Sequence, residues 1–168
     1  MTLHRRLRLL LIAAASSAVA LPAIPLHAAT PAPASVSSAE EQAVLAPIQA
    51  MFDGMASRDP AAMRQPLLPG GTMVLMRDGN PTQITFDAFA DRIARPAPNH
   101  IPTHIQERIH HPLIRVDNDL AMVWAPFDFL VDGKVDHCGT DLFNLVRKDG
   151  RWLIASVADT GRKLCPAH

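Results

Sequence analysis

Hydrophobic residues in the first part of the chain recur at the spacing of a helix. Between residues 38 and 57 the apolar positions fall on one helical face, which a helix would bury: Val44, Ile48, Met51, Phe52 and Met55. Ser38 precedes Glu41 by the three-residue spacing of an N-terminal capping box. Pro47 lies inside the stripe, so the helix is expected to kink there or to begin there.

Two shorter helices and one strand are predicted before residue 100. Asp59 and Pro60 suit an N-cap and a first helical position, for a helix that ends near Gln65. Residues 72–76 form a short apolar run that predicts a strand, closed by a turn over residues 77–81. Thr85 is the expected N-cap of a third helix, whose apolar residues share one face: Phe86, Phe89, Ala90 and Ile93.

From residue 105 onward the hydrophobic period changes from that of a helix to that of a strand. Four strands are predicted, over residues 105–116, 120–131, 134–147 and 151–160. Asp132-Gly133 and Asp149-Gly150, which separate the last three strands, are typical of two-residue hairpin turns. Helices followed by long antiparallel strands indicate an α+β fold.

The two hairpin turns also predict which side chains face each other. The expected cross-strand pairs are Asp128 with His137, Trp124 with Asp141, Ser156 with Phe143, and Ala158 with Asp141. Because side chains alternate along a strand, one face should carry Met122, Trp124, Asp128, His137, Asp141 and Phe143. The opposite face should carry Val123, Ala125, Phe127, Phe129, Cys138, Thr140 and Leu142. Both faces are largely apolar, and three helices can cover only one of them. We therefore expect a second copy of the chain to cover the other face, which predicts a homodimer.

Composition and charge narrow the class of protein. A length of 168 residues favours one domain, and 48% hydrophobic residues exclude intrinsic disorder of the body. Arg5, Arg6 and Arg8 precede the first acidic residue, Glu40, and the remaining chain holds 13 basic and 16 acidic residues. A body with a net charge of −3 argues against nucleic acid as a partner, because phosphate binding needs a basic surface.

The N-terminus has the build of a secretory signal peptide. Basic residues up to Arg8 precede an apolar run that is short for a membrane span, and cleavage is expected after Ala20 or near residues 28 and 29. A twin-arginine signal at Arg5-Arg6 and an uncleaved membrane anchor are the alternatives. Residues 1–29 are therefore predicted to be a signal peptide and residues 30–38 a linker rich in Pro, Ala and Ser. The mature protein is expected in the periplasm or secreted, with no membrane association.

The chain has two cysteines, Cys138 and Cys165. In an oxidising compartment they can form a disulfide, and a free buried thiol is the alternative.

Several segments of the second half resemble the nuclear-transport-factor-2-like superfamily. They are residues 119–129, 132–134, 137–141 and 148–154, with Asp159-Thr160. Within that superfamily the chain is most similar to SnoaL-like and lumazine-binding-like bacterial proteins. The resemblance covers the predicted body, residues 39–165, and implies a cone-shaped fold in which N-terminal helices pack on a curved antiparallel sheet around an apolar cavity, often in a dimer.

The same superfamily includes ketosteroid isomerase, scytalone dehydratase, limonene epoxide hydrolase and many binding domains without known catalysis, so the fold does not select a function. The isomerase and dehydratase members rely on tyrosine hydroxyls, and this chain contains no Tyr. No catalytic residue is carried over from them.

The candidate chemistry centres on His137. Asp128 facing His137 across two strands could orient the imidazole and raise its basicity, which would make His137 a general base with Asp141 as a second acid. The alternative is a structural cross-strand ion pair. Trp124 and Asp141 could form an apolar wall and a polar contact for a ligand, or a core Trp satisfied by a structural Asp.

Other chemistries find little support in the sequence. No metal site is predicted, because the eight histidines show no ligand spacing, and no cofactor is expected because no glycine-rich phosphate loop is present. Cys138 and His137 are adjacent in a strand and point to opposite faces, which argues against a nucleophile–base pair.

Three functions remain open. The leading prediction is an exported, dimeric domain that binds a small hydrophobic or aromatic molecule, without proven catalysis, in a cavity lined by Trp124, Asp128, His137, Asp141 and Phe143, with Met122 deeper. The second is a cofactor-free lyase or isomerase that uses His137, Asp128 and Asp141. The third is an accessory domain that binds a partner protein through the face of Phe127 and Phe129.

Overall fold

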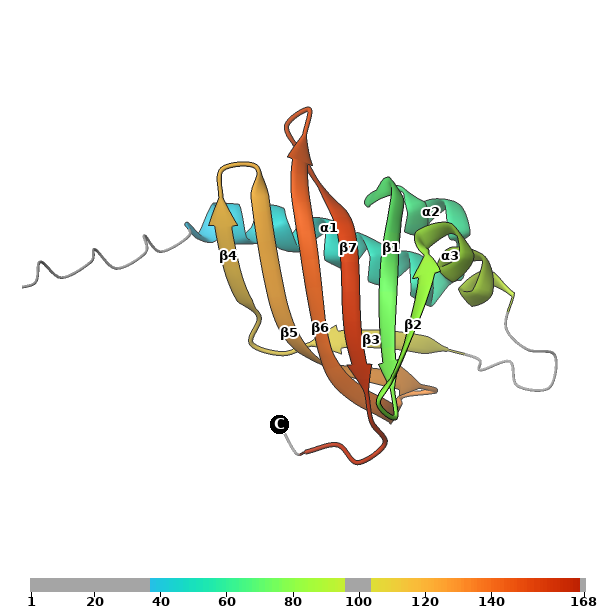
Figure 1. Cartoon of the computed structure of the whole chain (residues 1–168). Helices are drawn as coiled ribbons and strands as arrows, with labels where there is room; N and C mark the ends of the chain where they lie inside the picture. Colours follow the sequence, from blue (N-terminus) through green and yellow to red (C-terminus); the bar gives the residue numbers. More distant parts are fainter. Residues whose placement is uncertain (1–36, 96–103, 167–168) are drawn as a thin grey trace, which may run out of the picture. The chain divides into compact units, whose positions relative to one another are not determined.

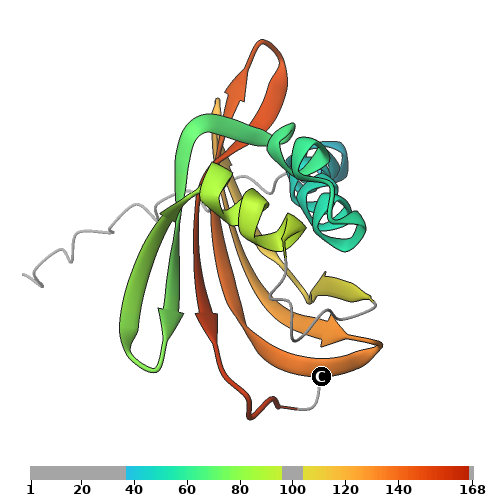
Figure 2. The same cartoon turned by 90° about the vertical axis from the view of Figure 1, so that its right-hand side faces the viewer.

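The computed structural model describes residues 37–95 and 104–166, which include every element named below. The helices are α1 (Ser38–Ser57), α2 (Pro60–Arg64) and α3 (Phe86–Ala94). The strands are β1 (Leu67–Arg77), β2 (Asn80–Thr85), β3 (Ile105–Ile109), β4 (Leu113–Asp117), β5 (Leu120–Val131), β6 (Lys134–Lys148) and β7 (Arg151–Gly161). The predicted α+β class is confirmed, with three helices on one side of a single sheet (Figures 1 and 2). The predicted signal peptide and nearly all of the predicted linker lie outside the described residues.

The helices begin where local hydrogen-bond chemistry favours them. The Ser37 hydroxyl accepts from the Glu40 backbone N–H at 3.3 Å, so the cap lies one residue before the predicted Ser38. Asp59 caps α2 ahead of Pro60, and Thr85 caps α3, both as predicted. Helix α1 begins well before Pro47 and continues through it. The whole predicted stripe of α1 is buried against the sheet, since Val44, Ile48, Met51, Phe52 and Met55 belong to the core.

The sheet has the strand order β2-β1-β7-β6-β5-β3, and β4 also pairs with β5. All neighbours are antiparallel except β1 and β7, which run parallel. Strand β1 is longer than the predicted 72–76 because this pairing reaches back to Leu67, and the largely exposed β2 was not predicted. The single strand predicted over 105–116 is wrong: it divides into β3 and β4 at residues 110–112, where His111 has a φ of 43°.

The two long hairpins have the predicted turns but not the predicted register. Residues 132–133 and 149–150 all have positive φ, as a two-residue turn of the mirror-image type requires. Each hairpin then contains a β-bulge, which adds one residue to one strand. In β6 the extra residue is Asp136, because Leu130 pairs with Val135 and Phe129 with His137. In β7 it is Ala155, because Leu145 pairs with Ile154 and Asn144 with Ser156.

These bulges correct the predicted cross-strand pairs. Beyond Asp136 every pair moves by one position: Asp128 faces Cys138, Trp124 faces Leu142, and Ala125 faces Asp141. Asp159 and Val157, not Ala158 and Ser156, face Asp141 and Phe143. A one-residue shift exchanges the two faces of a strand. The inner face, toward the helices, therefore carries His137, Asp141 and Phe143 with Phe127 and Phe129, and the outer face carries Met122, Trp124 and Asp128.

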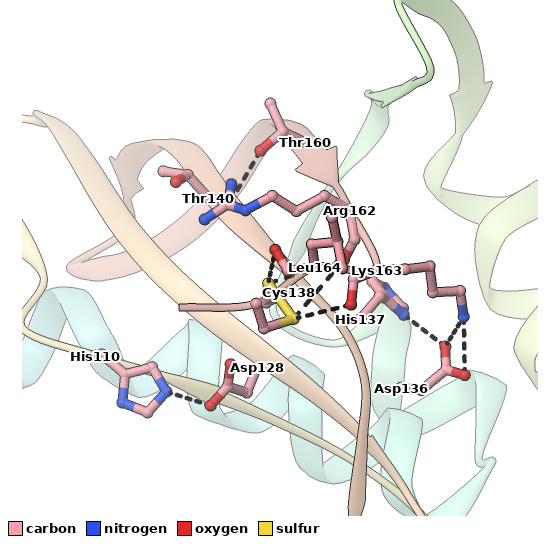
Figure 3. Close-up of a disulfide and its surroundings, with 11 residues drawn as sticks. His110, Asp128, Asp136, His137, Cys138, Thr140, Thr160, Arg162, Lys163 and Leu164 are labelled. Atoms are coloured by element: carbon pink, nitrogen blue, oxygen red, sulfur yellow. Dashed lines mark hydrogen bonds and ion pairs between the residues drawn. A yellow bond between two sulfur atoms is a disulfide. The ribbon is translucent and has the colours of Figure 1, made fainter. Parts of the chain in front are cut away.

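A disulfide joins Cys138, on the outer face of β6, to Cys165 in the C-terminal segment. Figure 3 shows this bond between two polar clusters, with the His110–Asp128 pair on one side and Asp136, His137 and Lys163 on the other. Backbone hydrogen bonds also join Cys138 to Arg162. The C-terminal segment is thus held on the sheet where β6 bulges. Within the described part of the chain, no helix is long and apolar enough to cross a membrane.

Candidate functional site

A cavity of about 230 Å³ lies between the inner face of the sheet and helices α1 and α3. Its apolar walls include Met51, Met55, Phe89, Phe127, Phe129 and Phe143. Figure 2 shows that β5 and β6 are curved and that the helices lie on the concave side of the sheet. The β-bulges contribute to this curvature, because a bulge bends its strand. The volume is just below the usual range of ligand pockets, about 300–1,000 Å³, and is suited to a small molecule.

Two carboxyl groups on neighbouring strands give this cavity its polar centre. Glu107 of β3 and Asp141 of β6 lie within hydrogen-bonding reach of each other, and we refer to them as the carboxyl pair. Asp141 is 3% exposed, and its Oδ2 atom has no hydrogen-bond partner among the residues that the structure describes. A buried ionised carboxylate without a donor is costly, so this pair is the most unusual feature of the cavity.

Burial controls the ionisation of the carboxyl pair. The Glu107 residue is partly exposed, but loss of water around its carboxyl is the main reason why its pKa rises to about 7. Loss of water, followed by the nearby charge of Glu107, raises the pKa of Asp141 well above its usual range. Both carboxyl groups are therefore harder to ionise than ordinary acidic side chains.

Arg77 and Asp159 form an ion pair beside the carboxyl pair. Arg77 Nη1 and Nη2 donate to the two oxygens of Asp159, each at 2.7 Å. These hydrogen bonds raise the pKa of Arg77, and the carboxylate of Asp159 largely balances the charge of the guanidinium. The Arg77 guanidinium is thus hydrogen-bonded to Asp159, and its charge also lowers the pKa of Glu107 and of Asp141, less strongly than burial raises them.

His137 lines the cavity on the same strand as Asp141. Its ring stacks on Phe129 with centroids 4.8 Å apart, and its Nδ1 atom lies 2.9 Å from Asp136 Oδ2. Hydrogen bonds from Lys163 and then from His137 keep the pKa of Asp136 below its usual range. Asp136 therefore orients His137, and Lys163 of the C-terminal segment fixes Asp136 in turn (Figure 3).

The structure separates the six predicted site residues into two groups. His137, Asp141 and Phe143 line the cavity. Trp124 is 49% exposed on the opposite face, and Met122 shares that face. Asp128 lies there as well, with Oδ2 3.0 Å from His110 Nε2. The predicted pairing of Asp128 with His137 is wrong because the β-bulge at Asp136 shifts the register of β5 and β6 by one residue.

Four polar residues of the described cavity lining were not identified from the sequence: Arg77, Arg92, Glu107 and Asp159. Glu107 lies between the polar neighbours Gln106 and Arg108, a pattern typical of a solvent-exposed strand. Its inward position follows from its pairing with Phe129, which depends on the division into β3 and β4. Arg77 and Asp159 are distant in sequence and meet through the parallel pairing of β1 with β7, for which the sequence carries no local signal.

Among the described residues there is no group of three or more His, Cys, Asp or Glu side chains that could hold a metal ion.

The family of the chain follows from its similarity to known proteins. A model of the family described as "Putative lumazine-binding" matches residues 39–158. The chain belongs to this family.

Solved structures of nuclear-transport-factor-2-like (NTF2-like) proteins share the fold of this lumazine-binding-family domain. An NTF2-like protein of unknown function from Shewanella baltica OS155 has a TM-score of 0.60 and 19% identity, over 77% of this chain and 98% of that one. An NTF2-like protein of unknown function from Silicibacter pomeroyi DSS-3 has a TM-score of 0.58 and 20% identity, over 76% of this chain and 100% of that one. At these identities the likeness concerns the fold. Among curated proteins, no sequence matches this chain.

Proposed function

We propose that this domain binds a small aromatic or otherwise apolar molecule in the cavity between its sheet and its helices. The observation that carries the proposal is an apolar, phenylalanine-rich cavity with one buried and unpartnered polar atom, Asp141 Oδ2. Apolar walls with a few polar groups are typical of small-molecule sites. The family description names lumazine, a flat bicyclic heteroaromatic molecule, and flat rings pack well against phenylalanine side chains.

Titration of the protein with lumazine, followed by calorimetry, tests this proposal. Phe129→Leu removes a ring that lines the cavity and should weaken lumazine binding about five- to tenfold. Leu142→Ala, on the outer face of β6, is the matched control and should leave the affinity unchanged. Equal losses in both variants would contradict binding in the cavity. Native mass spectrometry of protein purified from its own host would add the mass of any molecule that the cavity retains.

A cofactor-free lyase or isomerase is the second candidate, favoured by the pKa of about 7 at Glu107, which suits proton transfer near neutral pH. In such an enzyme, Asp136 rather than Asp128 would orient His137 as the general base, and Glu107 and Asp141 would act as the acids. His137→Gln distinguishes the two functions with any molecule that the protein binds. Turnover that disappears in this variant supports the enzyme, whereas an affinity change without any turnover in the parent protein supports binding alone.

We also infer that the protein is exported and forms a dimer. The disulfide between Cys138 and Cys165 supports an oxidising compartment, because such bonds rarely persist in the cytosol. N-terminal sequencing of the mature protein would test cleavage near residues 20–29. The exposed side chains of Leu113 and Trp124 support a second copy covering the outer face of the sheet.

A further inference from the structure

The carboxyl pair, Glu107 and Asp141, carries an inference that rests on the proposed function and deepens it. We propose that the cavity recognises an organic cation, an aromatic or apolar molecule that bears a protonated amine, and that the ammonium group lies between Glu107 and Asp141.

The first argument is the count of hydrogen-bond donors. When both are ionised, Glu107 and Asp141 can only accept hydrogen bonds, and Asp141 Oδ2 then has no donor among the described residues. Asp141 is 3% exposed, so bulk water does not supply one readily. An ammonium group has three N–H donors, which are enough for both carboxylates at once.

The second argument is the balance of charge around the cavity. Its described lining holds three carboxyls, from β3, β6 and β7, and two guanidiniums, from β1 and α3, with the imidazole of His137. Arg77 is engaged by both oxygens of Asp159. Arg92 lies on an exposed position of α3. No described cation is thus hydrogen-bonded to the carboxyl pair, and the nearby charge of Arg77 offsets only part of the rise in pKa that burial causes in Glu107 and Asp141.

The third argument is the chemistry of the walls. Phe89, Phe127, Phe129 and Phe143 line the same cavity as the carboxyl pair. The faces of aromatic rings attract cations, and the attraction is stronger where water is excluded. Aromatic rings combined with carboxylates favour an ammonium ligand over an anionic one.

Benzylamine and benzyl alcohol are matched probes for this proposal, because they share shape and size and differ in charge. At about pH 8 benzylamine is expected to bind at least tenfold more tightly than benzyl alcohol, measured by calorimetry or by chemical-shift titration. Benzylamine stays protonated over this range and competes with the proton on the carboxyl pair. Its affinity should therefore rise about tenfold from pH 6 to pH 8, across the pKa of Glu107.

Asp141→Asn should remove both the preference for the amine and its pH dependence, while binding of benzyl alcohol changes little. Glu107→Gln is the second variant, so that a folding defect in one does not decide the matter. Asp128→Asn removes an acid from the outer face of the same sheet and should leave both affinities unchanged.

The outcomes separate this inference from the proposed function. If benzyl alcohol binds as tightly as benzylamine, or if the amine's affinity does not change with pH, the organic-cation proposal is wrong and cavity binding stands. If lumazine, benzyl alcohol and benzylamine all fail to bind, the proposed function fails together with the inference.

Discussion

Asp141 lies where a purely structural residue would be apolar. Its neighbours across the sheet are Ala125 on one side and Asp159 on the other, and Phe143 follows it on the same face. Burying a carboxyl among such residues reduces stability unless a partner compensates for the lost water. Such a loss of stability is common where a ligand-binding group must be held in place in the absence of its ligand.

The carboxyl pair predicts how stability changes with pH. The pKa of Glu107 is about 7 in the folded protein and 4.5 in an ordinary environment, so the folded state holds a proton that the unfolded chain releases. Stability must then fall as pH rises from about 4.5 to about 7 and level off above that. Between pH 5 and pH 8 the free energy of unfolding should fall by about 2 kcal/mol more in the parent protein than in Glu107→Gln.

Urea denaturation followed by tryptophan fluorescence measures this difference. Glu41→Gln changes an exposed glutamate of α1 and should retain the pH dependence of the parent protein. Parallel curves for the parent protein and Glu107→Gln would show that Glu107 titrates normally.

At the scale of elements, the bulges at Asp136 and Ala155 explain why the site was predicted only in part. Periodicity and Asp-Gly turns predicted the last three strands almost to the residue, since alternation and turn chemistry are local properties. The position of a bulge depends on how two strands bend together over the helices, which no short stretch of sequence records. His137, Asp141 and Phe143 were grouped correctly because they follow the bulge on one strand. Asp128 was misplaced because it is on the other strand.

Gly139 lies between His137 and Asp141 on the inner face of β6, close to the backbone of β7. A Cβ atom there would overlap the Thr160 carbonyl oxygen and lie too close to the Phe127 ring. Because the carbonyl belongs to the backbone of β7, a side chain cannot simply rotate away. Gly139→Ala should therefore lower the free energy of unfolding by about 3 kcal/mol, as overpacking does in a dense core.

Thermal and urea unfolding of Gly139→Ala measure this effect. Thr140→Ala, the next residue on the outer face, is the control and is expected to cost less than about 1 kcal/mol. A Gly139→Ala protein as stable as the control would mean that β6 and β7 separate there more easily than the structure indicates.

At the scale of the whole molecule, the outer face of the sheet bears on assembly. Leu113 and Trp124 pair across β4 and β5 and are 44% and 49% exposed, and Met122 and Leu142 flank Trp124 on the same face. If this face is covered by a second copy, Trp124→Arg should convert a dimer into a monomer at micromolar concentration, because a buried unpaired charge opposes association.

Analytical ultracentrifugation distinguishes the two states. Leu164→Arg is the control, since Leu164 is 90% exposed in the C-terminal segment and lies outside the patch. A parent protein that sediments as a monomer, or a Trp124→Arg protein that remains a dimer, would exclude this face as the dimer interface.

The parallel pairing of β1 with β7 has a consequence for the order of folding. β1 ends at Arg77 and β7 begins at Arg151, so the inner edge of β1 stays unpaired until β7 has been synthesised. Contacts between such distant segments form slowly, because a long loop must close first. The ion pair of Arg77 with Asp159 forms only at that step. The sheet of a nascent chain therefore stays incomplete at β1 until β7 has been synthesised.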